Sequence, residues 1–425
     1  RDPLPFLLAA HREYGPVFRV RAMNQEIVVL AGVEANQFVA QHGAKHLENR
    51  EFWKDFGKEV EASNLLHIVD GRLHARLRKV MKPGFSAATL ARQIPLIVGT
   101  TERIVATWQP GERIEVVPFL RRLVTEQLGL LLANRAPGPY FEDLWCFMTT
   151  LLNVTVLKKW PRWMLYRPAY RRAKRRMWEL AQLVIDEHRE GPREREPDLI
   201  DDILSAAARE PDLFPPSELR MVVLAPFIAG LDTVVGTISF LLHALLTHPD
   251  ILARVRAEAE AVFADGPPPV DRLRRMTDLH GAVMETLRRY PVTPAIQRGV
   301  CESFEFAGYR VEAGSLLLIL TAAPHFLAEY YPNPERFDIE RYREPRKEHR
   351  SKPGVFAPFG LGSHTCLGAG LAELQIMLTT ATLLARARIE LDPPGAPLRK
   401  KINPLPYADR LFVRVDPLPS KGGPH

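Results

Sequence analysis

Phe359-Gly360-Leu361-Gly362-Ser363-His364-Thr365-Cys366-Leu367-Gly368 is the stretch of sequence that decides the fold, because it places one cysteine on a glycine-rich loop. Good helix formers follow from residue 367 to residue 378, so the pattern predicts that the sulfur lies at or near the N-terminus of a helix. At that position the unpaired N–H groups and the positive end of the helix dipole favour a thiolate over a thiol.

The glycines of this loop leave room for something large and flat. Gly360, Gly362 and Gly368 carry no side chain where the backbone must pass close to a bound group, and Phe359 can shield the sulfur from water. A haem iron fits this description, with Cys366 as its metal ligand. The alternative interpretation is a buried free cysteine beside a glycine-rich turn.

The same loop resembles the haem-binding loop of the cytochromes P450, pattern F-x-x-G-x-[RH]-x-C-x-G, and matches it at every fixed position. Residues 229–233 resemble the oxygen-binding helix of this family, residues 285–288 its E-x-x-R helix, and residues 334–337 its P-x-R-F segment. These segments fall in the family's order and, with residues 74–78, span most of the chain. The resemblance implies a mainly α protein with a smaller β-rich part, the cytochrome P450 fold, and heme b bound through Cys366.

The resemblance also implies one catalytic domain over residues 1–425, although length alone suggests two or three. We expect a β-rich N-terminal part at residues 1–45, a helical body at 46–290, a mixed β and haem-loop region at 291–415, and a tail at 416–425. Alternation of apolar and polar residues predicts a hairpin over residues 17–30, around Met23-Asn24-Gln25. Residues 87–263 read as mainly helical, and residues 303–321 as short strands with turns at 307–308 and 313–314.

Residues 221–246 form the one stretch apolar enough to suggest a membrane span. Asp232 lies at its centre, where a charge costs about 2.5–3.5 kcal/mol in a bilayer. Pro226 and Gly230 also interrupt the stretch. We therefore expect a central helix buried inside a globular fold.

Composition favours a soluble, cytoplasmic enzyme. Hydrophobic residues make up 46% of the chain and charged residues 25%, which allows a sizeable core. Cys146, Cys301 and Cys366 are too scattered for a disulfide framework or a zinc site, which suits a reducing compartment. The sequence begins with arginine rather than methionine, which is compatible with a removed N-terminal anchor.

Glu285 and Arg288 are three residues apart and share one face of a helix. An exposed pair worth a few tenths of a kcal/mol is the alternative interpretation. The resemblance implies instead a buried network with an arginine from residues 334–341, for which we select Arg336. Such a network would fix the backbone beneath the haem.

The two haem propionates require cations or strong hydrogen-bond donors. By resemblance, the matching positions are His74 and Arg78, Arg298, and His364, where arginine is commoner in the family. Each residue taken singly reads more readily as a surface cation than as a ligand contact. A neutral His364 would bind a carboxylate less firmly than arginine.

Asp232 and Thr233 carry the mechanistic inference. A threonine inside a helix usually bonds back to a carbonyl one turn earlier and does nothing else. Here it follows Ala229 and Gly230, small residues that would make room for oxygen. The resemblance implies that Thr233 and its waters hold bound oxygen while Asp232 relays protons for O–O cleavage, helped by electron donation from the thiolate.

We therefore expect an O2-dependent haem-thiolate monooxygenase that inserts one oxygen atom into an apolar substrate. Two alternatives remain: a peroxide-driven or electron-independent enzyme of the same fold, and a haem-based sensor or binding protein. The intact acid–alcohol pair counts against the first, and a sensor needs no proton relay. Turnover of NAD(P)H with a reductase system would separate both from the main hypothesis.

Electrons must come from outside, because the chain has no Gly-x-Gly-x-x-Gly turn and no cysteine cluster for an iron–sulfur centre. The resemblance implies a ferredoxin or flavodoxin with an NAD(P)H reductase. Cations on or beside the His74–Arg78 helix could attract such an acidic partner or form an ordinary solvated face. They are Arg72, Arg76, Lys79 and Lys82.

Register with the family also suggests which residues line the substrate pocket. They are Phe52, Trp53, Phe56, Leu65, Leu66, Ala225, Ala229, Val292, Ile296 and Leu405. These side chains predict an apolar ligand and do not identify it. Core packing explains most of them equally well.

Residues 158–178 mix cations with aromatic residues and contain no acid. The cations are Lys158, Lys159, Arg162, Arg167, Arg171, Arg172, Lys174, Arg175 and Arg176, and the aromatic residues are Trp160, Trp163, Tyr166, Tyr170 and Trp178. Peripheral membrane contact over a substrate entrance is one hypothesis. A solvated helical face, paired with acids such as Glu194 and Glu196, is the other. No motif supports nucleic-acid binding.

Overall fold

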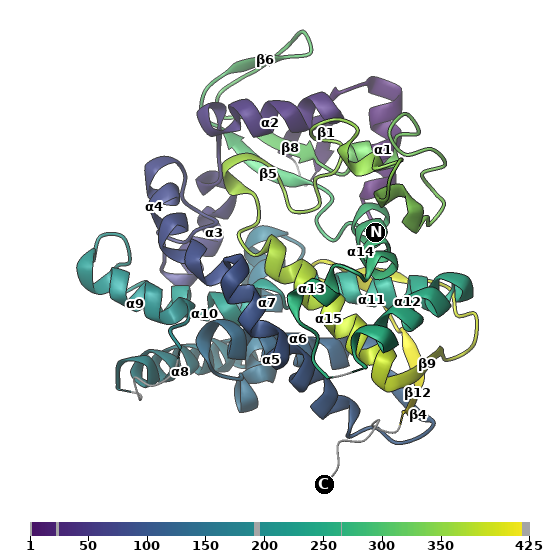
Figure 1. Cartoon of the computed structure of the whole chain (residues 1–425). Coiled ribbons are helices and arrows are strands. Elements are labelled where there is room, and N and C mark those ends of the chain that lie inside the picture. The colour runs from purple at the N-terminus through teal and green to yellow at the C-terminus, as the bar shows by residue number, and fades with distance from the viewer. Residues whose placement is uncertain (1, 23–24, 191–195, 265, 419–425) are drawn as a thin grey trace.

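Helices make up most of the described residues, which are 2–22, 25–190, 196–264 and 266–418 of this computed structural model (Figure 1). The helices are α1 (Leu4–Tyr14), α2 (Val33–His46), α3 (Arg50–Val60), α4 (Gly71–Met81), α5 (Ala87–Val105), α6 (Val116–Ala133), α7 (Phe141–Leu151), α8 (Pro168–Glu190), α9 (Leu199–Arg209), α10 (Leu219–Ala229), α11 (Thr233–Leu246), α12 (Pro249–Val262), α13 (Val270–Leu273), α14 (Thr277–Arg289) and α15 (Ala369–Arg386). The strands are β1 (Val17–Ala22), β2 (Gln25–Ala31), β3 (Leu47–Glu48), β4 (Glu112–Glu115), β5 (Ile296–Val300), β6 (Phe304–Phe306), β7 (Tyr309–Val311), β8 (Leu316–Leu320), β9 (Ala387–Leu391), β10 (Lys400–Ile402), β11 (Pro406–Ala408) and β12 (Phe412–Pro417). The predicted mainly α class with a smaller β-rich part is confirmed.

The largest sheet joins strands near the N-terminus to strands between residues 296 and 320, with strand order β1-β2-β8-β5-β3. β1 and β2 form the predicted hairpin, with Val17 opposite Leu30, although its turn at residues 23–24 lies outside the described residues. β2 then pairs in parallel with β8. Leu30 and Val29 point to opposite faces, so α2 packs on one face and α1 on the other. The stretch 1–45, predicted to be β-rich, therefore also contains two helices.

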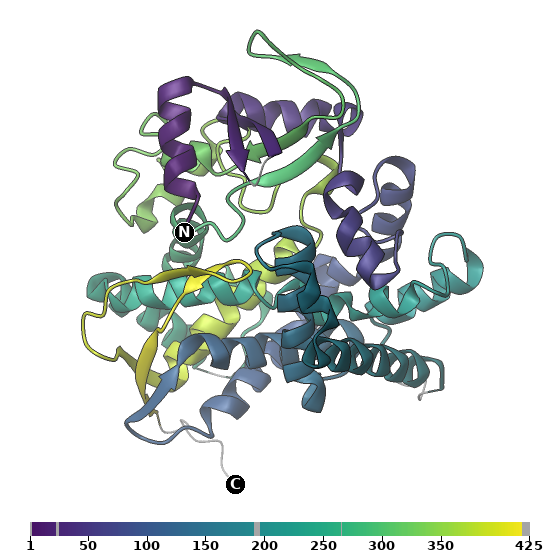
Figure 2. The same ribbon diagram turned by 180° about the vertical axis from the view of Figure 1, so that it is seen from behind.

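Short strands follow α14, as the sequence predicts. Residues 303–321 form β6, β7 and β8, and the turn residues Ala307, Gly308 and Gly314 have positive φ of 51°, 79° and 82°. Three strands in the order β4-β12-β9 form a separate sheet at the other end of the molecule, seen from behind in Figure 2. β12 runs to Pro417, so it includes the first two residues of the predicted tail, and residues 419–425 lie outside the described residues.

The long apolar stretch is two helices rather than one. α10 ends at Ala229 and α11 begins at Thr233, with Gly230, Leu231 and Asp232 between them. By length and composition residues 219–246 could cross a membrane, but they pack inside the fold against α6, α14 and α15. Burial among helices explains the apolar composition, and the break puts Asp232 at the edge of a cavity.

Candidate active site

The cysteine loop leads directly into α15, as predicted. Gly368 is the N-cap of this helix, and the backbone N–H of Cys366 donates to the carbonyl of Phe359 at 2.8 Å. Gly360 and Gly362 have φ of 76° and 69°, in the left-handed region that favours glycine. The loop therefore presents Cys366 to a cavity at the start of a helix.

Burial of the Cys366 sulfur outweighs the preference for a thiolate that the sequence predicts from the helix terminus. Burial raises the pKa of the Cys366 thiol, while the N–H of Gly368 and the charge of Arg78 act in the opposite direction. A coordinated metal cation deprotonates a thiol outright. The thiolate state of Cys366 thus depends on a bound metal more than on the helix terminus.

A cavity of about 570 Å³ contains Cys366 and the break between α10 and α11. The predicted site residues that line it are Trp53, Phe56, Leu65, Leu66, His74, Arg78, Ala225, Ala229, Gly230, Asp232, Thr233, Arg298, His364, Gly368 and Leu405. The structure thus brings together residues that the chain separates by more than 300 positions.

Five predicted residues do not line the cavity. Phe359 and Gly360 shape the loop instead. Phe52 stacks edge-on against Trp53 with ring centroids 5.3 Å apart. Val292 packs near Gly236, and Ile296 lies in β5 opposite Ile319.

Two arginines in the cavity lack an acidic partner. Arg78 donates to the carbonyl of Thr365 at 2.7 Å, and Arg298 donates to the carbonyl of Gln297 at 2.7 Å. Within the described part of the chain, neither has a carboxylate within 4.0 Å. Burial lowers the pKa of Arg298 to about 10, although Asp70 raises it. Two guanidiniums that face the cavity without a carboxylate partner fit a group that brings two carboxylates, as haem does.

Two histidines of the cavity, His74 and His364, have different surroundings. Burial, with the nearby His364 and Arg78, lowers the pKa of His74 to about 4, so His74 is neutral at pH 7. His364 lies 2.9 Å from Asp70 and 2.8 Å from the side-chain amide of Asn49, and its ring is 4.0 Å from that of His74. The sequence analysis missed Asn49 and Asp70. The signal for Asp70 was its N-cap position before α4.

Arg121 is a cationic neighbour of Asp232 that the sequence analysis also missed. Arg121 Nη2 lies 3.7 Å from Asp232 Oδ1, and its guanidinium lies 3.6 Å from the ring centroid of Trp145. Burial raises the pKa of Asp232 to about 7, against the lowering effect of Arg121. Arg121 interrupts the apolar stripe of α6 formed by Val117, Val124 and Leu128, and this was the available signal.

Thr233 makes the back-bond that a helical threonine usually makes. Its hydroxyl donates to the carbonyl of Ala229 at 3.0 Å, which leaves the oxygen lone pairs facing the cavity as acceptors. A Cβ on Gly230 would lie 2.5 Å from Leu128 Cδ1. Gly230 therefore permits close packing on α6, and Ala229 is the small side chain exposed at the cavity.

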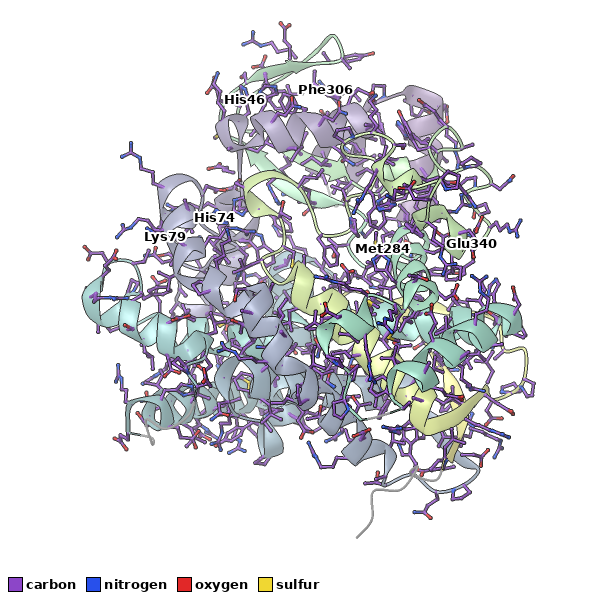
Figure 3. The ribbon with its side chains drawn as sticks, viewed as in Figure 1. His46, His74, Lys79, Met284, Phe306 and Glu340 are labelled. Carbon is purple, nitrogen blue, oxygen red and sulfur yellow. The ribbon has the colours of Figure 1, made fainter. Side chains whose placement is uncertain are left out.

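The Glu285 network is buried, but its second arginine is Arg341 and not Arg336. Glu285, Arg288 and Arg341 all have fully buried side chains, with Arg288 Nε 2.8 Å and Arg341 Nε 3.3 Å from the carboxylate. Arg336 is exposed and offers only its backbone carbonyl to Arg341. Met284, the residue before Glu285, lies on α14, and Glu340 lies on the segment Ile339–Tyr342 that packs against this helix (Figure 3).

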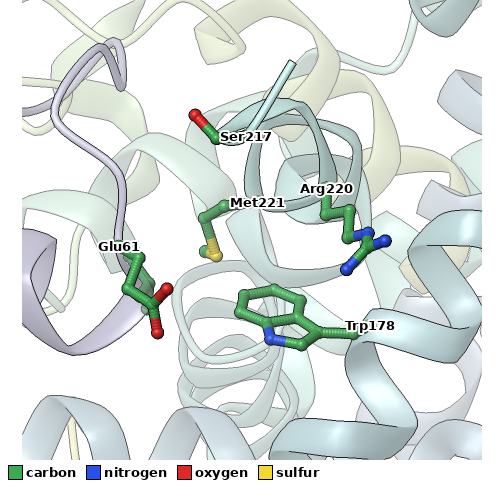
Figure 4. A pocket seen from close by; sticks show the side chains of 6 residues that line it. Glu61, Trp178, Ser217, Arg220 and Met221 are labelled. Carbon is green, nitrogen blue, oxygen red and sulfur yellow. The ribbon is translucent and has the colours of Figure 1, made fainter. Parts of the chain in front are cut away.

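A second, smaller pocket of about 80 Å³ lies at the surface, between the end of α3, α8 and the start of α10 (Figure 4). Trp178, Ser217 and Arg220 line it. Met221 lines both this pocket and the large cavity. The two spaces are thus neighbours that share one side chain.

This chain is similar to known proteins in sequence and in fold. The sequence profile of the cytochrome P450 family matches residues 3–412. Putative cytochrome P450 139 of Mycobacterium tuberculosis is 28% identical, covering 91% of this chain and 90% of its own. Cyclooctat-9-en-7-ol 5-monooxygenase of Streptomyces melanosporofaciens is 28% identical over 77% of this chain and 72% of its own. Sterol 14alpha-demethylase of Mycolicibacterium vanbaalenii is 24% identical over 92% and 88%.

Among solved structures, retinoic acid bound cyanobacterial CYP120A1 is similar in fold, with a TM-score of 0.84, 23% identity, and coverage of 96% of this chain and 93% of that one. The profile match over nearly the whole sequence decides the classification. The chain belongs to the cytochrome P450 family, and it is an oxidoreductase of the kind that holds a haem iron through a cysteine thiolate.

Proposed function

We propose that the enzyme is a monooxygenase that inserts one oxygen atom from O2 into an apolar organic substrate with two electrons from an external partner. The observation that carries this proposal is the Asp232–Thr233 pair, which lines the same cavity as Cys366 at the break between α10 and α11. An acid and an alcohol at this position supply protons, which a peroxide-driven enzyme or a sensor does not need.

In this proposal Cys366 binds the haem iron, and Arg78, Arg298, His74 and His364 hold its two carboxylates. The bound haem supplies the binding and reduction of O2. Phe359 and the glycines of the loop shape the backbone beneath it. Asp232 holds a proton at its carboxyl group. The hydroxyl oxygen of Thr233 can accept a hydrogen bond from a water, and that water can carry the proton into the cavity.

The lining of the cavity supports an apolar substrate. Trp53, Phe56, Leu65, Leu66 and Leu405 contribute apolar side chains. Two relatives are named for a sterol and for cyclooctat-9-en-7-ol. We infer a ligand of similar apolar character. Cys146, Cys301 and Cys366 are free, which suits the cytoplasm.

Thr233→Ala tests the proposed reaction. We expect haem and substrate binding to persist while reducing equivalents are diverted to hydrogen peroxide, because a water loses its hydroxyl partner. The measurement is the ratio of product to NAD(P)H consumed. Thr237→Ala is the control, since the Thr237 hydroxyl donates to the carbonyl of Thr233 one turn away and does not line the cavity. Wild-type coupling in Thr233→Ala would refute the assigned role.

A second test concerns pH. With a pKa of about 7, Asp232 carries its proton below pH 7 and loses it above, so coupled product formation should fall as pH rises through about 7. Arg121→Gln removes the cation that lowers this pKa, and the fall should move to higher pH. Arg122→Gln is the control, because Arg122 pairs with Glu142 in exposed positions. Superimposable profiles for Arg121→Gln and wild type would exclude a role for Arg121.

We propose that a ferredoxin or flavodoxin docks at α4, where Lys79 points outward (Figure 3). Arg76 is paired with Glu210, so it is a weaker candidate than the sequence suggests. Arg72, Lys79 and Lys82 are exposed, and no carboxylate of the described residues lies within 4.0 Å of them.

Charge reversal of Lys79 should slow the first electron transfer at low salt by about two- to tenfold, because exposed charges act within a Debye length of about 8 Å at physiological ionic strength. The measurement is stopped-flow reduction by an acidic ferredoxin. Lys58→Glu, an exposed cation on α3, is the control. Equal rates for both variants would move the docking surface elsewhere.

A further inference from the structure

The basic segment 158–178 pairs with acids of α3. Lys158 Nζ lies 3.7 Å and Arg162 Nη1 3.8 Å from the carboxylate of Asp55. One turn further along α3, Glu59 accepts a hydrogen bond from the Tyr170 hydroxyl at 2.9 Å and pairs with Lys174 at 3.1 Å. Asp55 and Glu59 are four residues apart and therefore share one face of the helix.

One of the acids expected from the sequence, Glu196, pairs outside the basic segment. Glu196 pairs with Arg92, and Glu194 lies outside the described residues. Glu61 lies 4.0 Å from Lys174, and Asp143 and Glu179 pair with Arg172, Arg175 and Arg176. Asp143 is located on α7 and Glu179 on α8.

The pairs on Asp55 join two walls of the large cavity. α3 contributes Trp53 and Phe56 to the lining. The roof, which we define as residues 141–190, comprises α7, the π-helical segment Leu152–Val156, the loop after it and α8. It contributes Met148 and Leu152 to the same lining. Separation of the roof from α3 would therefore open the cavity between these walls.

The roof is held on its other side by hydrogen bonds to neutral groups. The side-chain amide of Asn153 donates to Asn403 at 2.9 Å, and Lys159 Nζ donates to the carbonyl of Ile402 at 3.4 Å. Asn403 and Ile402 belong to the β10–β11 hairpin region, next to Leu405, which lines the cavity. Salt should therefore weaken the ion pairs between the roof and α3 much more than the hydrogen bonds between the roof and residues 402–403.

We propose that Asp55 is a positioning residue whose ion pairs with Lys158 and Arg162 hold the roof against α3 and set the rate at which large ligands reach the cavity. The side chain of Asp55 is 19% exposed and those of Lys158 and Arg162 are 45% and 71% exposed. Pairs of this exposure are weak and screened by salt. A weak attachment would let the roof separate from α3 when a large ligand enters.

The test measures ligand binding to the haem-loaded ferric protein, so it does not depend on the proposed monooxygenase reaction. Stopped-flow spectroscopy follows association and dissociation of a bulky azole and of imidazole, at low and high NaCl. In Asp55→Asn we expect both rates of the bulky azole to rise about three- to tenfold, with imidazole nearly unchanged. Wild-type rates for the bulky azole should rise with salt, and those of the variant should not.

Asp143→Asn is the matched control, since Asp143 pairs with Arg172 at 3.6 Å and Arg176 at 3.3 Å within the roof. Its rates should equal those of wild type. The double variant Lys158→Gln/Arg162→Gln should reproduce Asp55→Asn from the other side and add nothing to it. Wild-type azole rates in Asp55→Asn or in the double variant, or an equal acceleration in Asp143→Asn, would overturn the proposal.

Discussion

Cys366→His is expected to lose the thiolate signature of the reduced carbon-monoxide complex. Imidazole donates less charge to iron than a thiolate does, so the spectrum should become that of a histidine-ligated haem. The loop geometry around residue 366 depends on backbone hydrogen bonds and on left-handed glycines rather than on the sulfur. The replaced ligand, and not a collapsed loop, should therefore determine the change. Monooxygenase turnover should fall below detection.

Cys301→Ser provides the control for this substitution. Cys301 is exposed, and its sulfur lies 3.5 Å from the carbonyl of Lys45, far along the chain from the cavity loop. Its carbon-monoxide spectrum should match that of wild type. If Cys366→His kept the thiolate signature, another residue would have to be the iron ligand.

Arg341→Gln is expected to destabilise the protein by about 3–5 kcal/mol, because it leaves the buried carboxylate of Glu285 with one cation instead of two. Arg341 has a fully buried side chain and also donates to the carbonyls of Pro332 and Asn333 at 2.8 and 2.9 Å. Loss of these bonds should loosen the loop after β8 as well. Urea unfolding of the haem-loaded protein measures the effect.

Arg336→Gln is the matched control, five residues away in the same segment. Its side chain is exposed, so stability should change by no more than about 0.5 kcal/mol. Equal destabilisation by the two variants would show that the burial of Arg341 against Glu285 does not explain its contribution to stability. A stable Arg341→Gln would show that Arg288 alone satisfies Glu285.

The same pair of arginines shows what a sequence motif can predict. The Glu285–Arg288 spacing predicted a shared helix face, and the structure adds a buried pair. The motif located the second arginine only to residues 334–341. The path of an irregular loop buries Arg341 against Glu285 and leaves Arg336 exposed. Spacing along the chain carries no information about that path. Helix periodicity therefore predicted the pair within the helix. The choice of the second arginine required the geometry of the loop, which the sequence does not supply.

The residues that line the cavity also show what helix periodicity can and cannot predict. Trp53 and Phe56, three apart on α3, share the face that the family register implied. Phe52 lies four residues before Phe56, so helix periodicity also places it near this face, but its ring packs against Trp53 and does not line the cavity. Arg121 and Asp55 acquire their roles through contacts more than 100 positions away in the chain. Local pattern does not encode such pairings, so only the folded structure identifies them.

The parallel pairing of β2 with β8 has a consequence for biosynthesis. Val28 lies opposite Leu317, so the edge of the N-terminal hairpin leaves the ribosome long before its partner strand exists. At about 5–20 residues per second, the wait is on the order of tens of seconds. During that time an apolar strand edge is open to pairing with other nascent chains. A chaperone that covers this hairpin would therefore protect the newborn polypeptide until β8 is made.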